Sequence, residues 1–444
     1  MTLIDPPSIL APKGFTGQGV FCDVKQLGTG KGSNKGKKRD LAIIYSERPC
    51  VAAGMFTTNQ VCAAPVKVCL QHLEHDSAQA IVVNSGNANA CTGERGLKDA
   101  QAMCEQTAKA LGLLRSQILV ASTGRIGLPL PMGKIKSGII DASGQLTALQ
   151  SGADHVAEAI MTSDTHPKQF AVAVELGGKT VRIGAAAKGA GMIHPGMSPS
   201  GQRPLSMPLH ATMLGFVTTD ACIDKLTLQQ CLTQSVASSF NRITVDGDMS
   251  TNDTVLALAN GSAGNPLLSI SSKSSSMRQD LRHFQEALDH VCLELAKMLV
   301  RDGEGVSRFA TVFLEGARND LDADLALRSV CNSALVKTSW LGGDPNWGRI
   351  LDALGYSHAT IDPMRVDIAY SASKSSRKVH SLRAGKPSKV TFKTLCELVA
   401  GPEIFLHINL NLGKGRGVMY ASDLTEDYVT FNKGDVSDPA SLGG

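Results

Sequence analysis

The chain has 444 residues, of which 43% are apolar and 19% are charged, and its formal net charge is +4. This length is enough for two or three folding units with a sizeable core. The small net charge argues against a nucleic-acid partner, and no apolar run is long enough to cross a bilayer, so we expect neither nucleic acid nor membrane as a partner.

The amino-terminal segment and the cysteines indicate the compartment. Residues 1–15 lack the basic start and apolar stretch of a signal peptide. The eleven cysteines are scattered and form no Cys-x-x-Cys pair. This pattern predicts reduced thiols rather than disulfides or a zinc site. We therefore expect a cytoplasmic protein that holds no metal.

Apolar periodicity predicts a series of strands and two long helices. Gly177-Gly178 separates two of the strands and predicts a hairpin, and Gly112 is expected to end the first helix. A turn is expected at 413–415, after the last strand. In chain order, the expected elements are a strand at 80–83, a helix at 97–111, strands at 118–121, 170–174 and 180–183, a helix at 280–300, and strands at 310–314 and 404–412.

Strands and helices in this mixed order predict a layered α/β architecture with mixed sheets rather than a pure βαβ fold. Three segments are expected to be surface loops. Residues 28–39 are rich in glycine and basic side chains, and residues 261–277 are rich in serine and glycine. Residues 196–210 contain prolines that exclude a helix and disfavour a central strand.

The glycine–lysine segment could be compared with a phosphate-binding loop, but its spacing is wrong. No glycine lies five positions before Gly36-Lys37, and Lys38 stands where serine or threonine is required. A solvated basic loop is the better interpretation. Nucleic-acid binding by the same lysines would need interleaved aromatic residues, which are absent from the segment.

Three other motifs permit both a structural and a chemical interpretation. Thr123-Gly124 ends an apolar run, as a strand-to-turn junction would, but it could also supply oxyanion donors. Lys188 lies between a predicted hairpin and Gly189, where it could be a solvated strand end or an anchor for a negative group. Thr212 opens an apolar run, and its own position does not distinguish a strand residue from a nucleophile.

The order of several sequence blocks resolves this ambiguity, because together they resemble the ornithine acetyltransferase family, the self-processing enzymes of arginine biosynthesis. The blocks run in register across nearly the whole chain, which makes the resemblance specific. They are VVNSGNANACTG (82–93), ASTGRIG (121–127), IMTSDTHPK (160–168), AAKGAGMIHP (186–195), ATMLGFVTTDA (211–221), VDGDMSTNDT (245–254), RDGEGVSRF (301–309) and KTSWLGGDPNWGRI (337–350).

The resemblance implies a sandwich of mixed sheets and helices of the N-terminal-nucleophile type, cut by the protein itself between Ala211 and Thr212. Residues 1–211 would form the α chain and residues 212–444 the β chain, which stay together, with two copies of each in the assembly. Thr212 would then be the nucleophile. Its freed α-amine, with a pKa of about 8, would serve as its base.

The resemblance also assigns the remaining site residues. Thr123 and Gly124 match the oxyanion hole, and the expected reaction carries an acetyl group from N-acetylornithine to Thr212 and then to glutamate. No cofactor is expected, although some members of the family also accept acetyl-CoA as the donor. The substrate-binding positions match Thr162, Lys188, Thr212, Glu304, Asn432 and Ser437.

Residues 198–210 form a proline-containing insertion just before the expected cleavage point. Self-cleavage needs a well-aimed peptide bond, and we expect it to survive because everything after Thr212 is intact. Two alternatives stay open. One is an aminopeptidase or amidase of the related fold, in which water takes the acyl group. The other is an uncleaved, non-catalytic relative.

Overall fold

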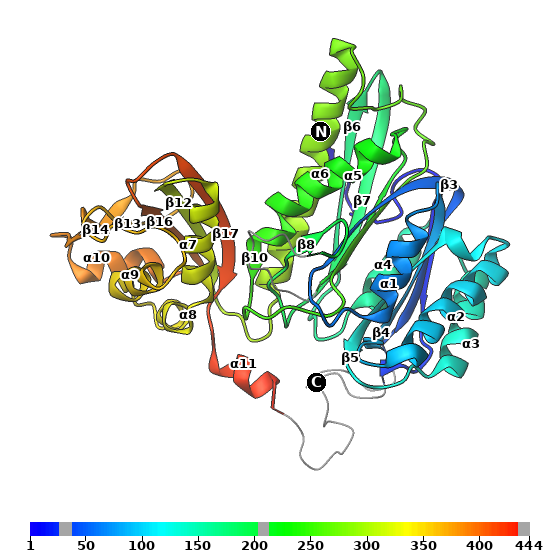
Figure 1. Ribbon diagram of the computed structural model, residues 1–444, viewed down its shortest axis with the longest axis horizontal. Coiled ribbons are helices and arrows are strands. Elements are labelled where there is room, and N and C mark those ends of the chain that lie inside the picture. The colour runs from blue at the N-terminus through cyan, green and yellow to red at the C-terminus, as the bar shows by residue number, and fades with distance from the viewer. Residues whose placement is uncertain (26–37, 203–212, 434–444) are drawn as a thin grey trace.

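The computed structural model describes residues 1–25, 38–202 and 213–433. It has a layered part, which holds most of the chain, and a smaller C-terminal lobe (Figure 1). Among the helices that are described, none has the length and apolar character needed to cross a membrane.

The layered part is built on one long sheet whose strands follow the order β1-β6-β7-β9-β11-β3-β4-β5, with β2 and β8 also paired to β3. The strands are β1 (Thr2–Leu3), β2 (Phe15–Val20), β3 (Leu41–Thr57), β4 (Ala78–Asn87), β5 (Ile118–Arg125), β6 (Lys168–Leu176), β7 (Lys179–Lys188), β8 (Met197–Ser198), β9 (Leu214–Thr219) and β11 (Thr254–Ala259).

Strand β3 divides this sheet into two portions. Its first half pairs with β2 and β4, and its second half pairs with β11. The pairing changes across the exposed segment 47–49, which ends in a proline that cannot donate a ladder hydrogen bond. Leu214, Phe216 and Leu256 share one apolar cluster with the side chains of β4 and β5, so the two portions pack on a common core.

Helices cover both outer sides of the sheet (Figure 1). α5 and α6 share a second apolar cluster with β6, β7, β9 and β11, while α1, α2 and α3 pack beside β2–β5, and α4 packs on β2 and β3. Their bounds are α1 (Ala64–His72), α2 (Gly93–Leu111), α3 (Met132–Gly144), α4 (Gln150–Ile160), α5 (Lys225–Ser238) and α6 (Ser275–Arg301). This arrangement confirms the predicted layered α/β architecture with mixed sheets.

The strands that follow residue 212 lie inside the sheet rather than at its edge. β9 runs antiparallel to β7 and parallel to β11, and β11 runs antiparallel to β3. Segments from after residue 212 are therefore inserted between two strands from before it.

The C-terminal lobe has its own sheet and its own apolar core. The strand order is β10-β17-β12-β16-β13-β14-β15, and helices α7 and α10 pack against it. The strands are β10 (Ile243–Thr244), β12 (Phe309–Ala317), β13 (Asp367–Ser371), β14 (Val379–Arg383), β15 (Lys386–Pro387), β16 (Glu403–Asn409) and β17 (Gly415–Ser422); the helices are α7 (Asp320–Asn332), α8 (Ala334–Leu341), α9 (Trp347–Gly355), α10 (Phe392–Val399) and α11 (Glu426–Phe431). In Figure 1, α11 leads from this lobe back toward the layered part.

Local sequence signals account for several element ends. Gly112 takes a left-handed conformation (φ 69°) and ends α2, as predicted. Gly177 and Gly178 both have positive φ and join β6 to β7, which confirms the predicted hairpin. The Ser274 side chain accepts a hydrogen bond from the Met277 amide and begins α6.

Three boundary predictions were wrong. The loop expected at 261–277 gives way to α6 at Ser275, because Ser274 caps the helix. The strand expected at 404–412 ends at Asn409, because the chain then turns through a positive φ at Asn411. Within the loop expected at 196–210, Met197–Ser198 pairs with β3 at the edge of the sheet, and residues 203–210 lie outside the described part. Most of the basic segment 28–39 is outside it as well.

Candidate active site

A pocket of about 180 Å³ lies where several segments of the layered part meet. It is bordered by the ends of β5 and β7 and by the loops after α4 and α6, and the residue after α11 also reaches it. The pocket brings together the predicted site residues that are described, which are Thr123, Gly124, Thr162, Lys188, Glu304 and Asn432. Three further predicted residues, Ala211, Thr212 and Ser437, lie outside the described residues.

The Thr123–Gly124 segment packs closely against the neighbouring strand β4 and is fixed by the loop before β11. Gly124 has a φ of 128°, and a Cβ atom there would lie 2.3 Å from the carbonyl carbon of Gly86 on the neighbouring strand. Glycine is therefore required both by conformation and by space. Asn252 donates from its side-chain amide to the Ser122 carbonyl (2.8 Å) and to the Ala88 carbonyl (2.6 Å), which fixes the strand end relative to the loop before β11.

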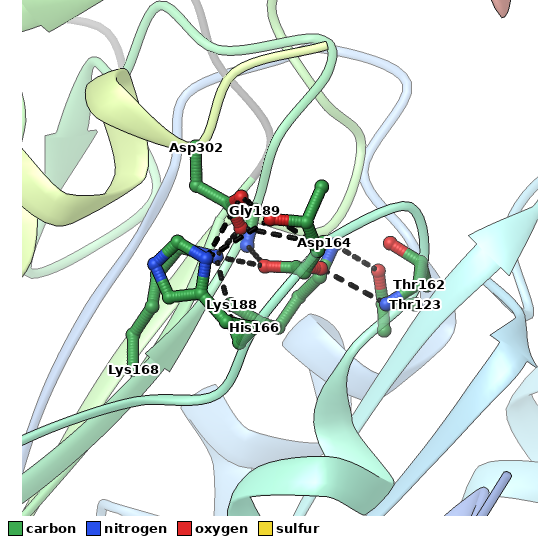
Figure 2. A network of polar contacts seen from close by, with 9 residues as sticks. Thr123, Thr162, Asp164, His166, Lys168, Lys188, Gly189 and Asp302 are labelled. Carbon is green, nitrogen blue, oxygen red and sulfur yellow. Dashed lines mark hydrogen bonds and ion pairs between the residues drawn. The ribbon is translucent and has the colours of Figure 1, made fainter. Parts of the chain in front are cut away.

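Lys188 crosses from β7 to this segment. Its ammonium group donates to the Thr123 hydroxyl oxygen at 3.3 Å (Figure 2). A lysine ammonium can only donate, so the Thr123 hydroxyl accepts this bond and keeps its own proton for another partner. Thr123 can thus donate to a developing oxyanion in the pocket, beside the positive charge of Lys188.

Lys188 is only 2% exposed, and burial lowers the pKa of its ammonium group. The carboxylates of Asp164, Glu304 and Asp253 act in the opposite direction, while the nearby Lys168 adds to the lowering. These carboxylates therefore favour the charged form of Lys188 against the effect of burial.

Glu304 follows α6 and also lines the pocket. Its amide donates to the Ala190 carbonyl at 2.9 Å, and its carboxylate accepts from the Asn432 side chain at 3.0 Å. A Cβ atom on Gly191 would lie 2.5 Å from this carboxylate, so the glycine makes room for it. Burial raises the pKa of the Glu304 carboxyl, and hydrogen bonds from Ser163 and Asn432 partly oppose the effect.

The end of the sheet next to the pocket also positions Met213, the residue that follows Thr212. Leu214 pairs with Lys188 on one side and with Thr254 on the other. The Met213 amide donates to Asp253 Oδ1 at 2.5 Å, whereas Asp253 Oδ2 is buried and has no hydrogen-bond partner among the described residues. Burial raises the pKa of this carboxyl well above its ordinary value.

Sequence reasoning did not single out Asp253, Asn252 or the charged group behind Lys188. The signal was present, because each of these residues lies inside a block that carried the resemblance. What the sequence lacked was any indication that residues far apart in the chain, such as Asp164 and Asp302, meet behind one pocket.

Comparisons with known proteins agree with the resemblance. The model of the ArgJ family matches residues 26–434. An arginine biosynthesis bifunctional protein ArgJ from Symbiobacterium thermophilum is 45% identical over 96% of this chain and 97% of its own length. ArgJ 1 from Clostridium acetobutylicum is 44% identical over 97% of this chain and 99% of its own. A solved structure of ornithine acetyltransferase with ornithine, from Mycobacterium tuberculosis, is 34% identical and covers 44% of this chain and 98% of that chain, with a TM-score of 0.38.

Proposed function

The chain belongs to the ArgJ family, the acetyltransferases of arginine biosynthesis, and from this premise we propose that it cuts itself before Thr212 and then carries acetyl groups on that residue. The donor is N-acetylornithine and the acceptor is glutamate. The observation that carries the proposal is the pocket that gathers Thr123, Gly124, Lys188 and Glu304 beside Met213.

In the self-cleavage step, the hydroxyl oxygen of Thr212 attacks the carbonyl carbon of Ala211. The Ala211–Thr212 amide bond breaks, the nitrogen takes up a proton, and water then hydrolyses the resulting ester. The products are a carboxylate at Ala211 and a free α-amine on Thr212. The hydroxyl of Thr123 and the amide of Gly124 stabilise the oxyanion in each tetrahedral intermediate.

Acetyl transfer then follows two half-reactions. Thr212 Oγ attacks the acetyl carbonyl of N-acetylornithine while its proton passes to the α-amine, and the released ornithine amine takes that proton. The amine of glutamate next attacks the acetyl ester, and the threonine hydroxyl is restored as it takes back a proton. A free α-amine, with a pKa of about 8, is a suitable base for both half-reactions near neutral pH.

Charge complementarity supports the choice of substrates. Lys188 presents a buried ammonium group to a substrate carboxylate, and Glu304 presents a carboxylate to the side-chain ammonium group of ornithine. Thr162 borders the same pocket. The Asn432 side chain donates a hydrogen bond to Glu304 and is proposed to bind substrate with it. Ser437 is proposed as a further substrate-binding residue.

The relatives are named bifunctional, which is the basis for proposing acetyl-CoA as a second acetyl donor. No bound cofactor is proposed, because acetyl-CoA would be consumed as a substrate. The mature protein would consist of residues 1–211 and 212–444, two copies of each, in the cytoplasm.

The mass of the purified protein under denaturing conditions tests the proposal. We expect one fragment that ends at Ala211 and one that starts at Thr212 from the wild type, and a single 46.7 kDa chain from Thr212→Ala. The cut protein should then transfer acetyl from N-acetylornithine to glutamate, with acetyl-CoA tested in parallel as donor. An intact wild-type chain would point to the uncleaved relative, and acetylornithine turnover that does not depend on glutamate would point to a hydrolase.

A further inference from the structure

Behind the pocket, three buried charged side chains connect segments that are distant in the sequence. Lys168, at the start of β6, contacts Asp164 Oδ1 at 2.7 Å and also contacts Asp302, which follows α6. The side chains of Lys168 and Asp164 are fully buried, and that of Asp302 is 2% exposed. Figure 2 shows this group with Asp164 lying between Lys168 and Thr162 in the view.

Asp164 contacts two of the segments that line the pocket. Its Oδ1 accepts from the Gly189 amide at 2.7 Å in addition to Lys168, and its Oδ2 accepts from the Thr162 amide at 3.0 Å. The residue next to Gly189 is Lys188, so one carboxylate fixes the backbone of two predicted substrate-binding residues at once.

Asp302 resembles Asp164 in burial and in its contact with Lys168, but its other partners differ. It accepts from the backbone amide and the hydroxyl of Thr165, and it lies 3.2 Å from His166 Nδ1. Its hydrogen bonds are to Thr165 rather than to Thr162 or Gly189, and the largest charge effect on the pKa of Lys188 comes from Asp164. The protein thus offers a matched pair of buried carboxylates, of which one bonds the amide next to the pocket lysine.

We propose that Asp164 is a positioning residue of this site, which fixes Thr162 and Lys188 and supplies the negative charge that keeps Lys188 an ammonium ion inside the protein. Lys188 can then hold the carboxylate of the incoming amino acid. The identity of that amino acid rests on the proposed function, whereas the effect of Asp164 on the charge of Lys188 does not.

The charges around Lys188 favour Asp164 over its neighbours in this role. Among the described residues, the charged groups with the largest effects on Lys188 are Asp164, the like-charged Lys168, Glu304 and Asp253. Burial raises the pKa of both Glu304 and Asp253, so each takes up a proton more readily than an ordinary carboxyl. Burial alone would raise the pKa of Asp164 too, but Lys168, Lys188 and the Gly189 amide lower it below its ordinary value. Asp164 therefore ionises at a lower pH than either of the other two.

The test compares Asp164→Asn with Asp302→Asn in the full-length protein. The first readout is the pH dependence of Lys188 acetylation by acetic anhydride, followed by peptide mass spectrometry, which needs no enzyme activity. We expect the midpoint of Lys188 labelling to fall by about one pH unit in Asp164→Asn and to stay near the wild-type value in Asp302→Asn.

The second readout is steady-state acetyl transfer. In Asp164→Asn the KM for glutamate should rise about tenfold on the alkaline side, with a smaller change in kcat, because the loss of the Lys188 charge weakens carboxylate binding. Asp164→Glu, which keeps the charge, should restore the wild-type KM for glutamate at alkaline pH. Asp302→Asn should lower the midpoint of thermal unfolding without changing the pH dependence of this KM.

Equal midpoints for Lys188 labelling in the two asparagine variants would overturn the inference. If Asp164→Asn does not fold, Glu304→Gln decides instead, since the inference requires it to move the Lys188 midpoint by much less than one pH unit. A larger shift would make Glu304 the main counter-charge and refute the role of Asp164. A wild-type protein that fails to transfer acetyl would defeat the proposed function, while the labelling result would still decide the role of Asp164.

Discussion

The candidate pocket of the layered part and a hollow on the C-terminal lobe differ in how they are built. The hollow on the lobe holds about 470 Å³ and is lined by Phe313, His407 and Val418 on adjacent strands of one sheet, with Lys374 and Lys378 beside them. The pocket of the layered part holds about 180 Å³, yet separate loops and strand ends converge on it with buried charged groups. Convergence of buried charges, rather than volume, distinguishes the candidate active site.

The two regions are also expected to contribute differently to stability and to the reaction. The lobe has a separate core, and Asn432 is the residue through which the described chain beyond Glu304 lines the pocket. We therefore expect changes in the core of the lobe to affect stability, and changes in the pocket to affect the reaction.

The largest expected effect is on the stability of the lobe. Trp340 is 1% exposed in the core of the lobe. Trp340→Ala should lower the free energy of unfolding by about 3–5 kcal/mol, through lost burial and the cavity it leaves. Urea unfolding measures this loss, and kcat/KM per folded molecule should stay close to the wild-type value. A large fall in kcat/KM would show that the lobe shapes the pocket directly.

A change in the pocket should slow the reaction rather than lower the stability of the lobe. Gly124→Ala would place its Cβ atom against the backbone of Gly86, so the strand end must move, and with it the donors proposed for the oxyanion. We expect kcat to fall by about 10²–10³-fold in acetyl transfer. The control is Gly127→Ala, which also has a positive φ but meets no atom within 4 Å. Comparable losses in the two variants would mean that backbone strain, not the position of the donors, limits the reaction.

The smallest effect is expected where the lobe reaches the pocket. Asn432 donates to the Glu304 carboxylate and so opposes the rise of its pKa that burial causes. In Asn432→Ala the carboxyl should hold its proton to a higher pH, and the acid limb of kcat/KM for N-acetylornithine should move toward neutral pH. The loss on that limb should be about two- to fivefold, as for one hydrogen bond. An unchanged pH profile would remove Asn432 from the binding set.

Local signals in the sequence were sufficient for elements whose ends are defined by a few residues. The hairpin of β6 and β7 follows from two adjacent glycines, and α6 follows from a regular apolar stripe. β3 was not predicted, because the polar segment 46–48 and Pro49 interrupt its apolar pattern. That interruption is the place where β3 changes partners, and the sequence alone cannot show which strands those partners are.

The residues of the candidate site were predicted from the family resemblance. The buried contacts that hold these residues in place were not predicted. Thr123, Lys188 and Glu304 are recognisable within their blocks, whereas the contact of Lys168 with Asp302 joins residues 134 positions apart. Neither periodicity nor motif spacing encodes such a contact. It follows from the packing of α6 on β6, which exists only in the folded chain.

The insertion of β9 and β11 between β7 and β3 bears on whether folding or self-cleavage comes first. If the chain is cut before Thr212, as proposed, a denatured molecule would have to rebuild the middle of a sheet from two separate polypeptides, so its unfolding should be effectively irreversible. The intact precursor has no such difficulty, because both pieces are still one chain. Folding must therefore come first, and a free amino terminus at Thr212 would be a chemical record that the molecule had already folded correctly.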